Sequence, residues 1–283
     1  MRKKIKIDIN PKGSLHFLYD TILGRCILKI LTLPVISKIV GAFMNSRLSI
    51  PLIDRFILKN NINMNEYENI KYKSYNEFFT RKILKEKREV SMIPNYFISP
   101  CDAKLTAYKI DSNLLFSIKG TTYSIPELLK NDKLANKYSN GTLLIFRLSV
   151  DDYHRYCYID NGSKDANTYI KGVLHTVQPI ALKKYNIYKT NCREYTVLHT
   201  EHFGDVIQVE VGAMMVGKIK NLHDKHTFTK GDEKGYFEFG GSTICLIINN
   251  DIIIDNEIWN NTNAGYETYV KYGERIGYIN GNL

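Results

Sequence analysis

The sequence predicts an α+β protein in which N-terminal amphipathic helices are followed by a largely antiparallel β body. The first observation is that apolar residues recur at helical spacing between residues 22 and 57. The second is that short apolar or alternating runs, separated by glycines, fill the chain beyond Pro94. We therefore expect two domains, a helical region at 1–73 and a β-rich domain at 74–283.

Three N-terminal segments are expected to form amphipathic helices, at 22–31, 35–44 and 52–57. In each segment the apolar residues follow an i, i+1, i+4, i+5 pattern, which lines one face of an α-helix. Ser49 is expected to cap the third helix, because a serine side chain accepts hydrogen bonds from the free N–H groups at a helix start.

The apolar stripes of these helices allow two interpretations. Amphipathic helices commonly pack their apolar face on a protein core. The opposite faces, however, carry basic residues with almost no acidic ones, which is typical of helices that lie in the interface of an anionic bilayer. Sequence alone does not decide between the two. The basic residues are Arg25, Lys29, Lys38, Arg55 and Lys59.

The chain beyond the helices has the pattern of strands joined by turns. Ser74 with Glu77, and Ser124 with Glu127, form capping boxes that predict two short helices. Ser99 and Pro100 predict a turn that leads into another strand. The expected strands lie at 141–148, 169–177, 193–199, 206–211 and 244–248.

The composition is that of a globular protein with an excess of basic charge. The formal net charge is +10, which favours an anionic partner. A nucleic acid is not expected as this partner, because no recognition module matches and the lysines are spread along the chain. The five cysteines form no CxxC pair, so we expect reduced thiols, as in a cytosolic setting, and no metal site.

A glycine pair interrupts a strand pattern near the C-terminal end of the chain. The alternating run 235–239 is followed by Gly240 and Gly241, then by Ser242, and then by the apolar run 244–248. Taken alone, this pattern is more often a β-bulge or a tight hairpin. The functional interpretation is a serine presented on uncrowded backbone.

His154 and Asp102 are the residues that could activate such a serine. His154 follows an apolar strand and has Asp151 and Asp152 beside it, where an imidazole can transfer protons near neutral pH. Ser242, His154 and Asp102 together supply a nucleophile, a base and an orienting carboxylate. Spacing in the sequence does not by itself bring the three together.

Seven short segments, in this order and spacing, carry a resemblance to one known family. They are FFTR at 78–81, SPCDA at 99–103, RLSVDDYHR at 147–155, NCRE at 191–194, VGAMMVGKI at 211–219, KGDEKGYF at 230–237 and GGST at 240–243. Through them the chain resembles the phosphatidylserine decarboxylase proenzymes, which are pyruvoyl-dependent, over nearly its whole length.

The resemblance implies an enzyme that cuts its own chain between Gly241 and Ser242. The products would be a long chain, 1–241, and a short chain, 242–283, held together as a heterodimer. Ser242 would itself be converted to the cofactor, a covalently bound pyruvate in the form of a pyruvoyl group, with Asp102 and His154 activating the serine. This group would form a Schiff base with phosphatidylserine and decarboxylate it to phosphatidylethanolamine, with His154 as the proton donor.

A lipid substrate also favours the membrane interpretation of the helices. We then expect 1–73 to associate with anionic membranes and 74–283 to be the decarboxylase domain. The expected location is the cytoplasmic side of the cell membrane, as a peripheral protein. The oligomeric state beyond the two chains is left open.

One departure from the family pattern leaves an alternative open. The family commonly has a second histidine three residues after the first, and Cys157 stands at that position here. Either His154 serves both self-cleavage and decarboxylation, or another histidine such as His175 enters the site. The alternative function is a homologue that does not process itself and acts as a lipid-binding or scaffold protein.

Overall fold

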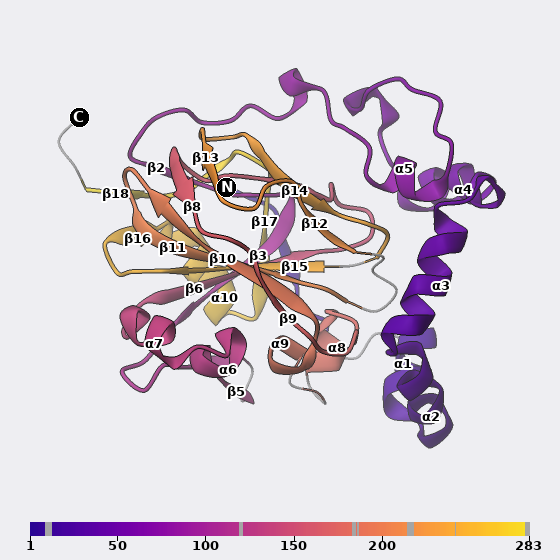
Figure 1. Ribbon diagram of the computed structural model, residues 1–283, viewed down its shortest axis with the longest axis horizontal. Coiled ribbons are helices and arrows are strands. Elements are labelled where there is room, and N and C mark those ends of the chain that lie inside the picture. The colour runs from indigo at the N-terminus through magenta and orange to yellow at the C-terminus, as the bar shows by residue number, and fades with distance from the viewer. Residues whose placement is uncertain are drawn as a thin grey trace.

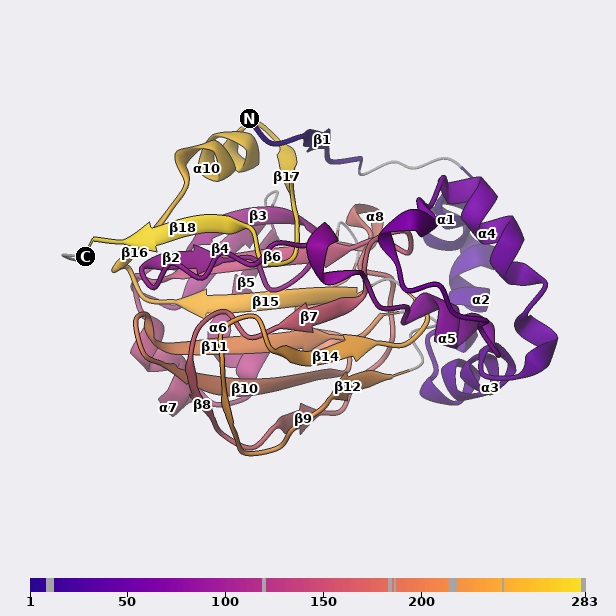
Figure 2. The ribbon, with the colours of Figure 1, turned by 90° about the horizontal axis from the view of Figure 1, so that it is seen from above.

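The computed structural model describes residues 1–8, 13–118, 121–182, 185, 187–213, 218–240 and 242–280. It confirms the predicted α+β class, because all pairings between the described strands are antiparallel and most of the longer helices come early in the chain. Figures 1 and 2 both show the N-terminal helices gathered at one end of the β body, opposite the C-terminus.

The three predicted N-terminal helices are confirmed, and a shorter helix precedes them. Together they are α1 (Ser14–Asp20), α2 (Ile22–Leu31), α3 (Pro34–Met44) and α4 (Leu52–Asn60). The prediction that Ser49 caps the third helix is wrong. Helix α4 follows Pro51 with no side-chain cap, and the Ser49 hydroxyl instead accepts a hydrogen bond from the Tyr75 amide at 2.9 Å.

Both predicted capping boxes begin short helices. The amides of Glu77 and Glu127 each donate a hydrogen bond, at 3.2 Å, to the serine three residues earlier. The helices of the body are α5 (Tyr75–Phe79), α6 (Ile125–Leu129), α7 (Asp132–Ala135), α8 (Pro179–Leu182), α9 (Ile187–Thr190) and α10 (Asn256–Asn263). Short 3₁₀ turns lie at Arg47–Ser49, Met64–Glu66, Lys85–Lys87 and Asn136–Tyr138.

A 10-stranded sheet forms the centre of the body, in the order β1-β17-β3-β6-β15-β11-β10-β8-β13, with β9 paired to β10. Its strands are β1 (Lys4–Lys6), β3 (Ala103–Lys109), β6 (Thr142–Leu148), β8 (Gly162–Lys164), β9 (Thr168–Ile170), β10 (Arg193–Thr200), β11 (Gly204–Val211), β13 (His226–Phe228), β15 (Ser242–Ile248) and β17 (Tyr266–Val270).

Three smaller sheets complete the body, in the orders β12-β14-β7, β16-β18-β2 and β4-β5. Their strands are β2 (Tyr96–Ile98), β4 (Leu115–Ile118), β5 (Thr121–Ser124), β7 (Arg155–Cys157), β12 (Ile219–Asn221), β14 (Glu233–Phe237), β16 (Ile252–Ile254) and β18 (Arg275–Ile279).

Four of the five predicted strands are confirmed as β6, β10, β11 and β15. The fifth, at 169–177, is wrong beyond Ile170, where β9 ends. Gly172 lies so close to another segment that a Cβ there would come within 2.2 Å of the Thr190 carbonyl oxygen. The chain at this point packs against the turn that follows α9 and does not continue in the sheet.

The centre of the large sheet is apolar on both faces. Along β6 and β15, Phe146 and Ile244 belong to one buried cluster, while Ile145 and Cys245 belong to a second cluster on the other face. Strands that are buried on both sides have continuous apolar runs, as 244–248 does. The first residue of β15 is therefore held by a rigid, fully packed strand.

Candidate functional site

Ser242 is the first residue of β15 and is completely buried. It pairs with Leu148 on β6, and the next residue pairs with Val211 on β11. Gly240, two residues earlier, has a φ of 131°, a backbone conformation that residues with a Cβ atom rarely adopt. The predicted break between two strands is therefore confirmed, while Gly241 itself lies outside the described residues.

His154 lies beside Ser242, although 88 positions separate them in the sequence. The His154 Nδ1 atom is 3.4 Å from the Ser242 Oγ, and both side chains are buried. The other ring nitrogen, Nε2, is 2.9 Å from the carbonyl oxygen of Ser149. Since a carbonyl only accepts, Nε2 carries the proton and Nδ1 has a free lone pair directed at the serine hydroxyl.

The surroundings of His154 keep its imidazole neutral. Burial, reinforced by the positive charge of Arg81, lowers the pKa of His154 to about 3. The ring of Phe79 covers the imidazole, with 4.2 Å between the ring centroids. Phe79 and Arg81 come from the FFTR segment, so that segment both covers the histidine and discourages its protonation. At neutral pH the histidine can therefore accept a proton.

Asp102 is not the group that orients His154 in this arrangement. Its buried carboxylate accepts hydrogen bonds from Arg88, at 2.6 Å to Nη2, and from the amide of Tyr272 at 2.8 Å. Both ring nitrogens of His154 already have other partners. The catalytic role of Asp102 therefore stays a prediction, without support from a direct contact.

The orienting group is the backbone carbonyl of Ser149, which a tight turn holds in place. The Asp152 amide donates to this carbonyl at 3.0 Å, and an Asp152 carboxylate oxygen accepts from the Ser149 amide at 2.7 Å. The same oxygen accepts from the Lys104 ammonium group at 2.6 Å. Burial raises the pKa of Asp152 to about 6, although the charge of Lys104 opposes this effect.

Sequence reasoning missed Ser149 and Lys104 for understandable reasons. Ser149 acts through its backbone, which carries no residue-type signal. Lys104 follows the SPCDA segment by one residue, and only the pairing of β3 with β6 brings it near the Ser149 turn. The one available signal was that Ser149 and Asp152 both lie within the RLSVDDYHR segment.

Cys157 and His175 occupy other places. The Cys157 thiol is buried in the core and donates a weak hydrogen bond to the Ser99 carbonyl, with 3.9 Å between sulfur and oxygen. Burial raises its pKa to about 12, so it is a neutral thiol near pH 7. The His175 Nδ1 lies 3.5 Å from the hydroxyl of Tyr19, and its ring stacks on Tyr185. Among the described residues, His154 is the histidine that contacts Ser242.

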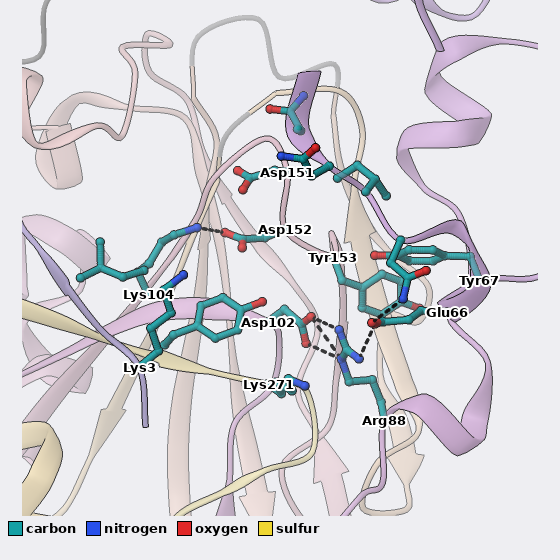
Figure 3. Close-up of a pocket in the computed structure, with 16 residues that line it drawn as sticks. Lys3, Glu66, Tyr67, Arg88, Asp102, Lys104, Asp151, Asp152, Tyr153 and Lys271 are labelled. Atoms are coloured by element: carbon teal, nitrogen blue, oxygen red, sulfur yellow. Dashed lines mark hydrogen bonds and ion pairs between the residues drawn. The ribbon is translucent and has the colours of Figure 1, made fainter. Parts of the chain in front are cut away.

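A polar pocket of about 420 Å³ opens next to this site. Asp102, Asp152 and Lys104 line it, and Figure 3 shows Lys104 directed at Asp152 and Arg88 directed at Asp102. Ser242 and His154 do not line this pocket. It gives water and polar ligands access to the side chains that hold the Ser149 turn, while the serine and histidine stay enclosed.

Comparison with known proteins shows which family the chain belongs to. The family model for phosphatidylserine decarboxylase matches residues 75–278. The chain belongs to the phosphatidylserine decarboxylase family. This membership confirms the resemblance seen in the sequence, and it confirms the predicted enzyme class, because these decarboxylases are carboxy-lyases.

Related decarboxylases match along most of their length. Phosphatidylserine decarboxylase proenzyme 2 of Clostridium acetobutylicum is 52% identical over 95% of this chain and 92% of the relative. A phosphatidylserine decarboxylase proenzyme of Clostridium botulinum strain Hall is 43% identical over 98% of this chain and 97% of its own length. A phosphatidylserine decarboxylase proenzyme of Clostridium novyi is 45% identical over 85% of this chain and 84% of its own length.

Proposed function

We propose that the chain is the proenzyme of a phosphatidylserine decarboxylase that cuts itself between Gly241 and Ser242. The observation that carries the proposal is the 3.4 Å contact between the Ser242 Oγ and the free lone pair on Nδ1 of a neutral His154. A buried hydroxyl beside a neutral, oriented imidazole is the arrangement that activates a serine nucleophile. The names of the relatives, which are proenzymes, support the same conclusion.

Self-cleavage starts with the transfer of a proton from the Ser242 hydroxyl to Nδ1 of His154. The Oγ atom then attacks the Gly241 carbonyl carbon, the amide C–N bond breaks, and the freed nitrogen takes up the proton from the imidazole. The amide becomes an ester. Loss of the α-proton of residue 242 and of the ester oxygen from its Cβ releases the Gly241 carboxylate. The resulting dehydroalanine takes up water and loses ammonia, which leaves the pyruvoyl ketone.

The residues around position 242 suit a pyruvoyl group. When present, this group supplies a ketone that binds the substrate amine and withdraws electrons from the bond to the leaving carbon dioxide. Backbone pairing with Leu148 holds position 242 at the start of β15. The ring of Phe79, which covers His154 and contacts Phe239, keeps water from the imidazole. His154 is thus placed to hold a proton at Nδ1 and to return it.

The two cleavage products are expected to stay together as a heterodimer. The short chain, 242–283, includes β15, which lies between β11 and β6, and β17, which lies between β1 and β3. Separation would expose both faces of β15 and leave backbone groups of the four neighbouring strands unpaired. Strand pairing on both sides of the short chain therefore supports a stable complex.

We further propose that α1–α4 dock the enzyme on the surface of an anionic membrane. The apolar stripe of α2 faces outward, with Ile22 76%, Leu23 64% and Ile30 57% exposed, and Ile39 on α3 is 62% exposed. A helix face with several exposed apolar side chains fits a lipid surface better than water. The Lys and Arg residues near it, six against two acidic residues between 13 and 61, favour anionic lipid.

The mode of attachment is peripheral in this proposal. Within the described residues, no single helix is long and apolar enough to cross a bilayer. Helix α2 and Val35–Met44 of α3 meet that criterion only together, with a bend of 70° between them. The free thiols of the five cysteines support the cytoplasmic side of the cell membrane as the location.

Intact-mass spectrometry of the purified protein tests the proposal. The wild type is expected to give two species, 1–241 and a pyruvoyl-bearing 242–283, and to convert phosphatidylserine vesicles to phosphatidylethanolamine. Ser242→Ala is expected to remain one chain, while Ser117→Ala, at an exposed serine on β4, processes normally. A wild-type chain that keeps an unmodified serine after long incubation would instead support a non-processing lipid-binding homologue.

A further inference from the structure

The first residues of the chain are bound to the part that becomes the short chain. Strand β1 pairs with β17, with Lys4 opposite Thr268 and Lys6 opposite Tyr266. The pairing extends at both ends, because the Ile7 amide donates to the Gly265 carbonyl at 3.2 Å and the Tyr269 amide donates to the Lys3 carbonyl at 2.8 Å. The N-terminal segment thus forms an edge strand of the large sheet, next to β17.

Arg2 adds a set of ion pairs at the end of this strand. Its guanidinium group lies 3.0 Å from the Asp255 carboxylate, 3.5 Å from that of Glu257 and 2.5 Å from that of Glu274. The backbone amide of Arg2 also donates to Glu257 at 2.9 Å. The Arg2 side chain is only 16% exposed. Three carboxylates therefore converge on one partly buried cation.

The backbone pairs and ion pairs described here for residues 2–7 all end on residues between 255 and 274, beyond the proposed cleavage point. We propose that residues 2–7 form an N-terminal clasp that retains the short chain once the Gly241–Ser242 bond is broken. This inference rests on the proposed self-cleavage. The partner of the clasp is the enzyme's own product chain.

Cleavage changes what the clasp has to do. In the uncut precursor, the covalent link keeps β17 next to its partners at a high effective concentration. After cleavage only non-covalent contacts remain, and β17 without the clasp would be an edge strand with unpaired backbone groups. Loss of Arg2 would also leave the carboxylates of Asp255, Glu257 and Glu274 close together with less positive charge to balance them.

Release of the short chain from the processed enzyme tests the clasp. Arg2→Glu, and separately deletion of residues 2–7, are compared with wild type in moderate urea, and free 242–283 is quantified by size exclusion and mass spectrometry. Both variants are expected to release the short chain roughly tenfold faster or more, because losing one partner of a largely desolvated charge pair mainly raises the dissociation rate. Lys133→Glu, an equal charge change at an exposed residue of α7, should release it at the wild-type rate.

A second comparison separates retention from general folding. In a Ser242→Ala background the chain stays in one piece, so Arg2→Glu should change its urea midpoint much less than it changes short-chain release. Release of the short chain at the wild-type rate from both clasp variants would overturn the clasp. So would a loss of stability from Arg2→Glu in the uncut Ser242→Ala chain as large as its effect on short-chain release. If the wild type is never cut, the proposed function fails and the clasp fails with it. If the chain is cut but release is unchanged, only the clasp fails.

Discussion

The carbonyl oxygen of Ser149 accepts a hydrogen bond from Nε2 of His154 at 2.9 Å, which leaves Nδ1 as the nitrogen that faces Ser242. In many sites with a serine nucleophile a carboxylate orients the histidine, and here a backbone carbonyl orients it. The carbonyl cannot take up the proton, and it fixes the tautomer that self-cleavage needs. The stability of the Ser149 turn should therefore control how fast the chain processes itself.

Asp152→Asn should slow self-cleavage by about tenfold or more, which corresponds to a lost charge-assisted hydrogen bond. The asparagine has nearly the same volume and its amide oxygen can still accept from the Ser149 amide, but it carries no negative charge, so the contacts weaken and the Lys104 ammonium group loses its counter-charge. Adding Lys104→Met to Asp152→Asn should restore part of the rate. The measurement is the time course of chain cleavage by mass spectrometry.

Asp151→Asn is the matched control for this prediction, since Asp151 is the exposed neighbour of Asp152. It should process at the wild-type rate. Wild-type processing by Asp152→Asn would show that the carboxylate does not hold the turn. A double variant as slow as the single one would remove Lys104 from the explanation.

The low pKa of His154 predicts how stability depends on pH. The native histidine stays neutral down to its pKa of about 3, whereas an unfolded histidine takes up a proton below about pH 6.5. The unfolded state therefore binds more protons in this window. The free energy of unfolding should fall by up to about 1.4 kcal/mol per pH unit as the pH drops from 6.5 toward 3.

His154→Gln removes this contribution while the amide can still donate to the Ser149 carbonyl. Urea unfolding of Ser242→Ala with and without His154→Gln, between pH 7 and pH 4, should give the shallower slope for the double variant. Asp152 acts in the opposite direction, because its raised pKa of about 6 makes the native state bind the extra proton. It is present in both proteins and so largely cancels in the difference. Equal slopes would mean that His154 titrates normally in the native state.

Cys157→Ala should leave self-cleavage within a few-fold of the wild-type rate. The thiol is neutral, since burial raises its pKa to about 12, and its hydrogen bond goes to the Ser99 carbonyl. A modest loss of stability is expected from the small cavity left in the core. Processing is followed by intact mass and stability by urea unfolding. A block as complete as that of Ser242→Ala would place the thiol in the reaction.

Leu23→Asp should weaken vesicle binding by about tenfold or more, because burying a leucine side chain in an apolar phase is worth about 1.5–3 kcal/mol. Sedimentation with vesicles of phosphatidylserine and phosphatidylcholine measures the effect, and high salt should weaken wild-type binding as well. Leu222→Asp is the matched control, since Leu222 is an exposed leucine of the β body at 48% exposure. Equal losses in both variants, or equal wild-type binding to vesicles of phosphatidylcholine alone, would contradict docking by the helices.

Several of the helices and two of their capping residues could be predicted because each depends on a pattern of residues that are close together in the sequence. The helical periodicity of 22–31 and the capping serines Ser74 and Ser124 each depend on residues within one or two turns. The direction of the apolar stripe of α2 could not be predicted, since periodicity defines a face without saying what lies opposite it. The structure resolves this point: Ile22 and Leu23 face outward.

Long-range relationships had to come from the structure. The pairing of Ser242 with Leu148 joins segments far apart in the chain, and no residue pattern specifies that register. The residue types suggested Ser242 as a nucleophile, His154 as a base and Asp102 as the orienting carboxylate, and the structure brings His154 to Ser242. The Asp102 carboxylate instead accepts a hydrogen bond from Arg88, and the group that orients His154 is the backbone carbonyl of Ser149.

The central position of β15, between β6 and β11, has a consequence for the life of the enzyme. Folding from a single chain brings this strand into the middle of the sheet without any need for two molecules to meet. Once the Gly241–Ser242 bond is gone, refolding would require the two pieces to find each other in solution. Persistence of the mature enzyme would then depend on how slowly it unfolds. Self-cleavage in such a protein is a one-way step, and an unfolded copy has to be replaced by new synthesis.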